Sequence, residues 1–329
     1  MSQVAVRQLG KSGIEVSAVG MGCWAIGGPF TTSKGVSAGW SKVDDDQSIR
    51  AIHRALDLGI NFFDTADLYG AGHSEKILGE AIQGRRDKVV VATKFGCVID
   101  EEKKQWVDND GSPDYMREAL EASLRRLNTD YIDLYQFHYW GYPAEKAEPI
   151  RDALEDVVGE GKIRGYAWST DLIESIKVFA EGPNCIAVQQ RLNVLAGSEE
   201  VLAFCERNDL ASINRSPLAM GILTGKFQKD TQFPDDDLRS QTNWFGGFEG
   251  GKPDPEWLSK FYAIKDILAS NGRTYAQGAI AWLWARSENT IPIPGFKSVA
   301  HVEENAAAMQ FGPLTPNQLT EIDELLGRD

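Results

Sequence analysis

Residues 60–70 read INFFDTADLYG, an apolar run that ends in an acidic residue and continues into a polar loop. Two comparable runs follow at 88–95 (KVVVATKF) and 131–138 (YIDLYQFH), and all three are too apolar to have a solvated face. Amphipathic stretches lie between them at 74–82 and 115–127, and their spacing predicts helices. The pattern therefore predicts parallel strands that helices cover on both faces.

The same alternation of strand and helix extends in both directions along the chain. We expect further strands at 17–22, 162–169, 185–193, 210–214 and 289–295. We expect further helices at 46–58, 147–160, 173–180, 199–207 and 276–286, and a β-hairpin with a glycine turn at 7–17. Counted from residue 17, eight strands alternate with helices, as a closed (β/α)8 TIM barrel requires, although an open doubly wound sheet can produce a similar pattern.

The expected fold class is α/β, as a TIM barrel with an N-terminal β-hairpin and a C-terminal helical extension. No Pro/Gly-rich linker with a change of composition interrupts the chain, which predicts one domain over 1–329. The segment 228–255 is too polar and too rich in Gly and Pro to be core. A loop of this length either closes over an active site as a lid or is plain surface.

Composition excludes several classes of protein. Of the 329 residues, 42% are apolar and 25% are charged, which excludes global disorder. The net charge of −14 makes nucleic acids and anionic membranes unfavourable partners. The four cysteines are scattered, so we expect neither a metal site nor a disulfide framework. No apolar run is long enough for a membrane helix and the N-terminus lacks a signal-peptide core, so we expect a cytoplasmic protein.

A glycine motif at 20–25 (GMGCWA) formally matches the GxGxxA pattern of Rossmann dinucleotide sites, with Asp44 near the offset expected for a ribose contact. In a Rossmann fold this turn runs directly into a helix whose N-terminus meets the pyrophosphate. Here the next residues include Pro29 and several glycines, which cannot propagate a helix. We therefore expect no Rossmann site.

Four polar residues lie at or just beyond the ends of three consecutive predicted strands: Asp64, Tyr69, Lys94 and His138. In a barrel these ends converge on one mouth. Each residue alone could be structural, but a carboxylate, a phenol, an amine and an imidazole at neighbouring strand ends together indicate chemistry. A barrel metallohydrolase would need clustered His and carboxylate ligands, and of the four histidines only His138 is at a strand end.

The four side chains have complementary acid–base properties. A phenol with a pKa near 10 is a poor acid at neutral pH, but a nearby ammonium lowers that pKa. We expect Lys94 to lower the pKa of Tyr69, and Asp64 to keep Lys94 charged. A neutral His138 could donate a hydrogen bond that orients a carbonyl oxygen beside the Tyr69 hydroxyl. These groups would protonate an oxyanion as it forms, which carbonyl reduction by hydride demands.

The chain resembles an aldo-keto reductase over essentially its whole length. The resemblance rests on six segments in the family's order: FFDTADLYG, ATKFG, DLYQFH, AVQQRLNVL, SPLAMGILTGKF and IPIPGFKSVAHVEENA. It implies a (β/α)8 barrel with an N-terminal hairpin and hydride transfer between NADP(H) and a small-molecule aldehyde or ketone. The resemblance is to bacterial NADPH-dependent members related to the potassium-channel β-subunits. It also implies that Tyr69 is the proton donor, that Lys94 and Asp64 tune it, and that His138 positions the carbonyl.

The resemblance further implies a set of cofactor-binding residues. Ser169 and Gln189 would hold the nicotinamide carboxamide, and Thr170 stands where Asn is usual, which would rearrange one hydrogen bond. The loop that crosses the pyrophosphate would contribute Ser216, Pro217, Leu218, Gly221, Leu223 and Lys226. The adenosine and its 2′-phosphate would be held by Gly295, Lys297, Ser298, His301, Glu304 and Asn305. Further cofactor contacts are expected from Gly22, Cys23, Trp24, Asp64 and Arg215.

Lys297 and Ser298 also point to phosphate binding independently of the family. They precede a predicted helix that begins near Val299, so an ammonium, a hydroxyl and free backbone N–H groups can form a phosphate nest, with an ordinary helix cap as the alternative. Lys297 and His301 form a basic spot in an acidic chain. This favours NADP(H) over NAD(H), which has no 2′-phosphate.

Arg215 stands where many family members have an aromatic ring stacked on the nicotinamide. A guanidinium is planar and can stack, but it is cationic, as is the oxidised nicotinamide. We predict that Arg215 weakens the binding of NADP⁺ relative to NADPH and so favours reduction.

The substrate pocket is expected to include Trp24, Tyr69, Trp140, Trp244 and Phe245. Aromatic walls suit apolar and sugar-like carbonyls alike. The alternative function is a regulatory subunit that binds the cofactor, reports its redox state to a protein partner and turns over little substrate. The sequence does not indicate an oligomeric state.

Overall fold

Eight parallel strands form the central sheet of the computed structural model, which describes residues 5–41, 43–234, 237–241 and 246–328. Their order across the sheet follows their order in the chain. The strands are β3 (Met21–Gly22), β5 (Phe62–Asp64), β6 (Val90–Phe95), β9 (Leu134–Phe137), β10 (Tyr166–Ser169), β11 (Cys185–Arg191), β12 (Ala211–Arg215) and β15 (Thr290–Pro292).

The first and last strands meet and close the sheet. Gly22 forms a parallel bridge with Gly295. The N–H of Gly20 donates to the carbonyl of Pro292 at 2.9 Å, and that of Gly22 to Pro294 at 3.0 Å. The predicted TIM barrel is therefore confirmed, and the open doubly wound sheet is excluded.

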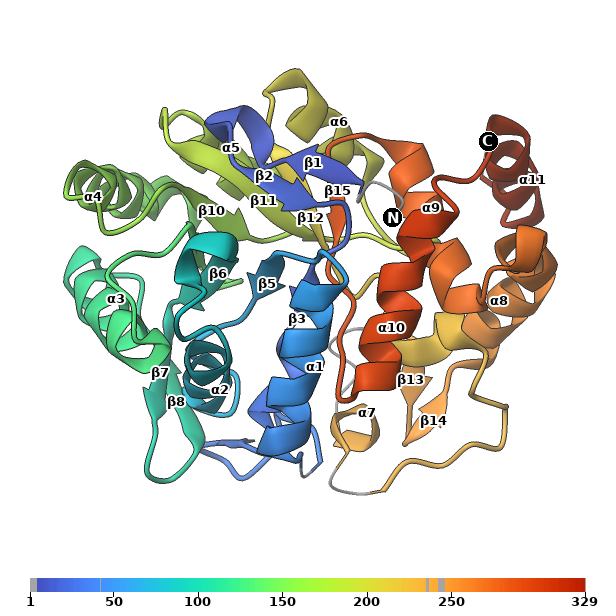
Figure 1. Ribbon diagram of the computed structural model, residues 1–329, viewed down its shortest axis with the longest axis horizontal. Coiled ribbons are helices and arrows are strands. Elements are labelled where there is room, and N and C mark those ends of the chain that lie inside the picture. Colours follow the sequence, from blue (N-terminus) through green and yellow to red (C-terminus); the bar gives the residue numbers. More distant parts are fainter. Residues whose placement is uncertain (1–4, 42, 235–236, 242–245, 329) are drawn as a thin grey trace.

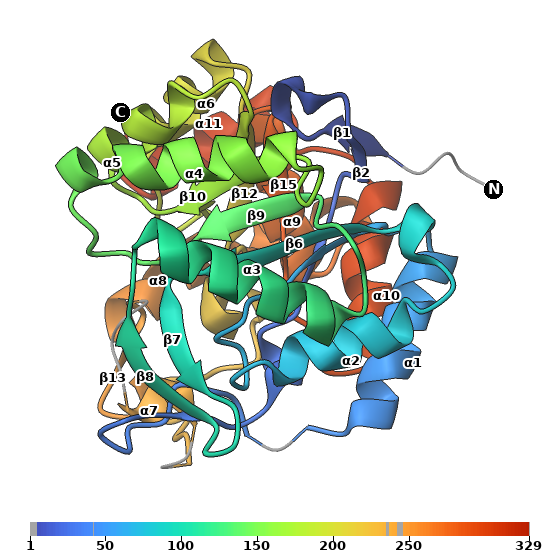
Figure 2. The same ribbon diagram turned by 90° about the vertical axis from the view of Figure 1, so that its left-hand side faces the viewer.

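Helices cover the outer face of the barrel, as Figures 1 and 2 show. Eight of them are α1 (Asp45–Asp57), α2 (His73–Ala81), α3 (Pro113–Leu127), α4 (Glu148–Gly159), α5 (Ile173–Ala180), α6 (Glu199–Arg207), α9 (Tyr275–Arg286) and α10 (Val299–Ala307). Local sequence fixes where they begin: the Asp44 side chain caps α1, Ser112 caps α3, and Thr274 forms a capping box with Gln277 in α9. The predicted helix ends agree with these bounds to within two residues.

The N-terminal hairpin, β1 (Val6–Gln8) and β2 (Glu15–Ser17), covers one end of the barrel (Figure 1). Leu9, Ile14 and Val16 of this hairpin pack in one buried cluster with inward-facing strand residues such as Phe62. The turn needs Gly10, because φ is +55° there and a Cβ would collide with the carbonyl oxygen of Ile186. The hairpin therefore plugs the amino end and leaves the carboxyl end for a site.

The opposite end carries most of the remaining strands, in loops (Figure 1). They are β4 (Thr31–Thr32), β7 (Cys97–Asp100), β8 (Gln105–Asn109), β13 (Phe248–Glu249) and β14 (Lys252–Pro253), and the short helix α7 (Leu238–Gln241) lies beside them. The described part of the predicted loop 228–255 thus contains α7, β13 and β14.

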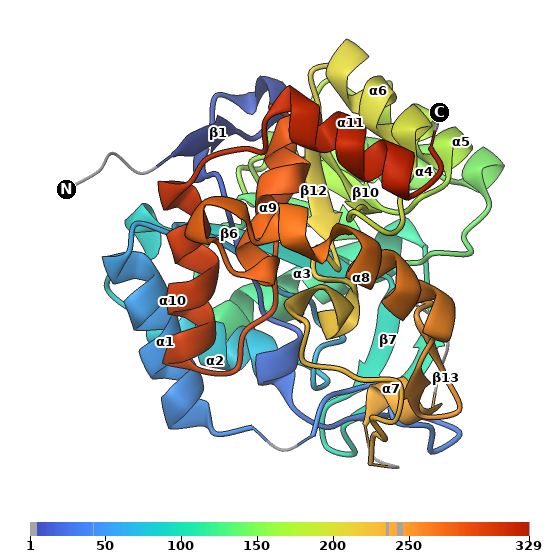
Figure 3. The same cartoon turned by 90° about the vertical axis from the view of Figure 1, so that its right-hand side faces the viewer.

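One predicted strand lies mostly outside the barrel sheet, and two elements of the structure were not predicted. The strand expected at 17–22 is shortened to β3, because Ser17 belongs to the hairpin strand β2. The hairpin β7–β8 was not predicted, and neither was α8 (Pro255–Leu268), which packs beside α9 and α11 (Pro316–Leu325) in Figure 3. Helix α11 confirms the C-terminal helical extension.

The glycine motif at 20–25 leads into one turn of 3-10 helix at Ala25–Gly27 and then into β4, so no helix long enough for a Rossmann site follows it. Within the described ranges, none of the helices has the length and apolar character that a membrane crossing requires.

Candidate active site

The four residues predicted to carry chemistry lie together at the carboxyl end of the barrel. Asp64 is the last residue of β5, Lys94 lies near the end of β6, and His138 directly follows β9. Strand β6 pairs with β5 on one side and β9 on the other, so these strand ends are adjacent. Tyr69 lies in the loop that follows β5 and returns to Lys94.

Lys94 is the centre of the cluster. Its ammonium nitrogen Nζ lies 2.6 Å from Asp64 Oδ1, 2.7 Å from the Thr65 carbonyl oxygen and 3.2 Å from Tyr69 Oη. The side chain is fully buried, so these three acceptors satisfy all three of its N–H groups. Burial alone would lower the pKa of Lys94, but Asp64 and Tyr69 together outweigh the burial, and the pKa is raised. Lys94 is therefore an ammonium, as predicted.

The second oxygen of Asp64 is held by two amides. Gln136 Nε2 donates to Oδ2 at 2.9 Å and Gln189 Nε2 at 2.7 Å, and the two glutamines contact each other at 3.1 Å. Gln136 was not among the site residues predicted from the sequence. The available signal was its position two residues before His138 on one strand, since alternate residues of a strand face the same side.

The pKa of Tyr69 is raised, because burial disfavours the phenolate more than Lys94 favours it. Lys94 does lower the pKa of Tyr69, as expected, but burial raises that pKa by more, and burial cannot be seen in the sequence. Burial, together with Lys94 and Arg215, holds the pKa of His138 well below its ordinary value. His138 is therefore neutral near pH 7, and its Nδ1 has no hydrogen-bond partner among the described residues.

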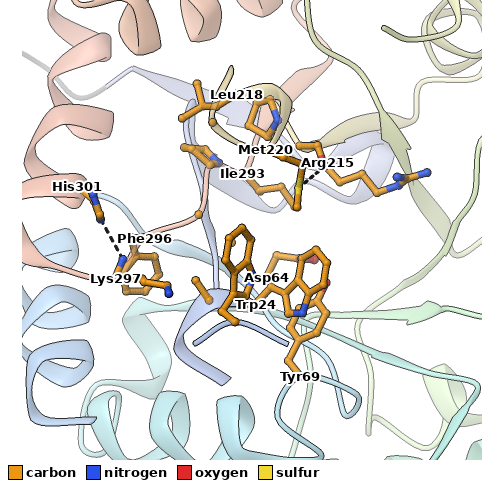
Figure 4. Close-up of a pocket in the computed structure, with 18 of the residues that line it drawn as sticks. Trp24, Asp64, Tyr69, Arg215, Leu218, Met220, Ile293, Phe296, Lys297 and His301 are labelled. Carbon is orange, nitrogen blue, oxygen red and sulfur yellow. Dashed lines mark hydrogen bonds between the residues drawn. The ribbon is translucent and has the colours of Figure 1, made fainter. Parts of the chain in front are cut away.

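Asp64, Tyr69 and His138 line a cavity of about 560 Å³, and Figure 4 shows Asp64 and Tyr69 at its wall. Trp24 stacks on Tyr69 with ring centroids 5.8 Å apart and 22° between the planes. Trp140 packs edge-on against His138 on one side and Trp106 on the other. The end of the cavity near Tyr69 is therefore walled largely by aromatic rings.

Another part of the same cavity is rich in cations, and Figure 4 shows Lys297 and His301 across the cavity from Tyr69. The charged and titratable residues lining this part are Lys226, Arg239, Lys297 and His301, with Asp237 and Glu304. Burial and then the neighbouring Arg239 lower the pKa of Lys226. Asp237 binds Arg239, with 2.8 Å to Nε and 2.6 Å to Nη2. Positive charge thus exceeds negative charge around this part of the cavity.

Comparison with known proteins identifies the family. The model of the aldo/keto reductase family matches residues 18–327. The chain belongs to the aldo/keto reductase family. The predicted resemblance is confirmed, and with it a family whose members act on small-molecule carbonyl compounds.

Relatives of this aldo/keto reductase match it almost end to end. The NADP(+) aldo-keto reductase yakc of Schizosaccharomyces pombe is 31% identical over 316 residues, which cover 93% of this chain and 87% of the relative. The structure of the glycerol dehydrogenase AKR11B4 from Gluconobacter oxydans superposes with a TM-score of 0.82 at 32% identity, covering 99% of this chain and 96% of the other. An aldo-keto reductase from Klebsiella pneumoniae in complex with NADPH superposes with a TM-score of 0.71 at 26% identity, covering 99% and 96%.

Most of the residues predicted to bind cofactor line the cavity of this reductase. They are Gly22, Trp24, Asp64, Gln189, Arg215, Ser216, Pro217, Leu218, Gly221, Lys226, Gly295, Lys297, His301, Glu304 and Asn305. Of the residues predicted for the substrate pocket, Trp24, Tyr69 and Trp140 line it, whereas Trp244 and Phe245 lie outside the described residues.

Five predicted cofactor residues are not among those that line the cavity. Cys23 and Leu223 are fully buried. Ser169 donates to Gln189 Oε1 at 3.3 Å, and Thr170 accepts from the Leu172 N–H at 3.2 Å. The Ser298 side chain caps α10 by accepting from the His301 N–H, and an ordinary helix cap was the alternative to a phosphate site at this segment. Contacts of these five residues with a cofactor stay predictions.

Several lining residues were not predicted, notably Trp40, Ser41, Trp106, Asp237 and Arg239. Trp106 lies on β8 and Arg239 on the short helix α7, and the other three lie in loops. None of these segments has a hydrophobic periodicity that indicates a site, so the sequence carried no signal for them. Asp237 and Arg239 belong to segment 228–255, so part of that loop does reach the cavity.

The loop after β12 has an unusual backbone. Ser216, Ala219 and Met220 all adopt left-handed φ values, of 53°, 47° and 54°, and Gly221 follows at 102°. A non-glycine residue in this region costs about 1 kcal/mol or more, and such residues concentrate at functional sites. This strained loop lines the cavity between Arg215 and Lys226.

Proposed function

We propose that this aldo/keto reductase reduces aldehydes or ketones to alcohols with NADP(H), and that Tyr69 donates the proton. One observation carries the proposal: the ammonium of Lys94, held by Asp64, lies 3.2 Å from Tyr69 Oη at the wall of a cavity that also contains His138. Because Lys94 donates to the phenol oxygen, the Tyr69 hydrogen is available to a group in the cavity.

The lining of the cavity fits an anionic dinucleotide. Lys226, Arg239 and Lys297 supply cations for its phosphates, which supports NADP(H) over NAD(H) since only the former has a 2′-phosphate. Arg215 and Gln189 line the cavity near Tyr69, where a nicotinamide would lie. The cofactor, when bound, supplies the hydride.

The chain's own residues then handle the proton. A neutral His138 donates a hydrogen bond to the carbonyl oxygen and places it beside Tyr69. As negative charge develops on that oxygen, the Tyr69 O–H bond breaks and an O–H bond to the substrate forms. The phenolate left on Tyr69 is stabilised by Lys94, whose charge Asp64 maintains. The aromatic wall formed by Trp24, Trp106 and Trp140 would pack against the substrate.

The test is the loss of NADPH absorbance with a panel of aldehydes and ketones, for the wild type and Tyr69→Phe. General acid catalysis contributes about 10²- to 10⁴-fold, so we expect a loss of that size in kcat/KM while NADPH binding, followed by protein fluorescence, persists. Tyr142→Phe is the matched control, because among the described residues the Tyr142 hydroxyl donates to the Lys146 carbonyl, and Tyr142 does not line the cavity.

A Tyr69→Phe variant with most of its activity would exclude the proposed proton donor. A wild type that binds NADPH but reduces no member of the panel would instead favour the redox-sensing subunit.

A further inference from the structure

Arg215 and Asp171 form an ion pair beside the reacting part of the cavity. Arg215 ends β12 and lines the cavity, whereas Asp171 lies just beyond β10. Arg215 Nη2 lies 2.5 Å from Asp171 Oδ2. The other carboxylate oxygen, Oδ1, accepts the backbone N–H of Arg191 at 2.6 Å. The backbone therefore fixes the carboxylate, and the carboxylate fixes the guanidinium.

The charge of Arg215 is felt by the groups that handle the proton. It contributes to the lowered pKa of His138 and opposes the raised pKa of Tyr69. The Arg215 Nε is buried and has no hydrogen-bond partner in the part of the chain that the structure describes. Asp171 thus binds only one edge of the guanidinium and neutralises only part of its charge. The rest of the electrostatic field of Arg215 acts in the cavity.

We infer that Asp171 sets how strongly the site distinguishes NADPH from NADP⁺, acting as a positioning residue through Arg215. This inference rests on the proposed function. The nicotinamide ring of NADP⁺ is positively charged and that of NADPH is neutral, so a neighbouring cation disfavours only the oxidised form. Arg215 alone would repel NADP⁺, as the sequence suggested, but Asp171 offsets part of that repulsion. The balance of the pair, not the arginine alone, fixes the preference.

The decisive variant is Asp171→Asn, which removes the charge and keeps one acceptor oxygen, enough for Arg191 or Arg215 but not for both. We would measure the Kd of NADP⁺ and of NADPH separately by quenching of tryptophan fluorescence at low ionic strength. The Kd of NADP⁺ divided by the Kd of NADPH should rise about three- to tenfold. A change of this size corresponds to one screened charge interaction. Arg215→Gln should lower the ratio below that of the wild type, because it leaves the Asp171 carboxylate unbalanced. Adding Asp171→Asn to it should raise the ratio again toward the wild-type value.

Two controls separate charge from structure. Asp171→Glu retains the charge and should keep the wild-type ratio, and Asp152→Asn, in an exposed ion pair with Arg151, should also leave it unchanged. A ratio that stays constant in Asp171→Asn, or equal weakening of both forms, would overturn the inference. If the wild type binds neither cofactor, the proposed function itself fails, and the two outcomes are distinguishable.

Discussion

Lys94 donates to the hydroxyl oxygen of Tyr69 at 3.2 Å and has no N–H left for any other group. The phenol is consequently an acceptor toward the protein and a donor toward the cavity. This orientation is what a proton donor needs. It depends on two further hydrogen bonds. Gln136 and Gln189 donate to the carboxylate of Asp64, and Asp64 in turn binds Lys94.

Lys94→Met should abolish most activity and also destabilise the protein. Loss of assistance to Tyr69 should reduce kcat/KM by about 10²-fold or more. The variant leaves Asp64 as a buried carboxylate without its cation, which typically costs about 3–5 kcal/mol. Urea unfolding measures the second effect. The double variant Asp64→Asn with Lys94→Met should regain stability but not activity, and a double variant as unstable as the single would contradict the buried-charge explanation.

The pH dependence should differ between the two directions of the reaction. Reduction needs a protonated Tyr69, and its raised pKa keeps it protonated through neutral pH, so kcat/KM should stay level there and fall only on the alkaline side. Oxidation of an alcohol needs the phenolate and should accelerate as pH rises. The pKa of His138 is well below its ordinary value, so neither profile should show a step near pH 6.5. Such a step would mean that His138 titrates during turnover.

Gln136→Leu should reduce kcat more than it weakens cofactor binding, because Gln136 does not line the cavity. The substitution removes the amide 2.9 Å from Asp64 Oδ2 and leaves Lys94 and Tyr69 in place. Because Asp64 would then be less well fixed, we expect about a tenfold loss in kcat, the effect of one lost hydrogen bond to a charged group. Gln136→Asn keeps the amide but shortens its reach, so its kcat should lie between those of the wild type and Gln136→Leu. Unchanged kcat in Gln136→Leu would show that Gln189 alone suffices.

The sequence was most informative where chemistry follows regular structure. Asp64, Lys94 and His138 could be placed together because the ends of parallel strands converge, and Gln136 was within reach of the same argument. Arg239 was out of reach of that argument, because it lies on α7, a four-residue helix that is not part of the alternation of barrel strands and helices. Helix α8 did carry a signal, with Leu258, Phe261, Ile264 and Leu268 buried on one face, but it follows directly on the polar loop and was missed.

The cationic part of the cavity predicts a preference between cofactors. Arg239→Met and Lys297→Met should each weaken NADPH binding about tenfold or more, because a hydrogen bond to a charged group contributes about 1.5–3 kcal/mol, and should leave NADH binding nearly unchanged. Fluorescence titration with both cofactors measures this. Lys252→Met is the control, an exposed cation outside the cavity. If NADH weakens as much as NADPH, these cations contact the pyrophosphate, which both cofactors share.

Asp67 predicts a pH-dependent stability that is separate from catalysis. It is buried two residues before Tyr69, where Oδ1 accepts the Leu68 N–H at 2.6 Å and Oδ2 has no partner among the described residues. Burial and then Glu75 raise the pKa of Asp67 well above its ordinary value. The pKa of an Asp in the unfolded state is about 3.9, so between that pH and its pKa in the folded state Asp67 binds more protons in the folded protein. The free energy of unfolding must therefore fall as pH rises through this range.

Asp67→Asn removes this titration and keeps the acceptor for Leu68. Urea unfolding at pH 5 and pH 8 should show a smaller decrease in stability between the two pH values for the variant than for the wild type. Asp87→Asn, at an exposed position, should behave like the wild type. Equal decreases in the wild type and Asp67→Asn would mean that Asp67 is ionised in the folded protein, with its charge balanced by Arg126, which opposes the rise in its pKa.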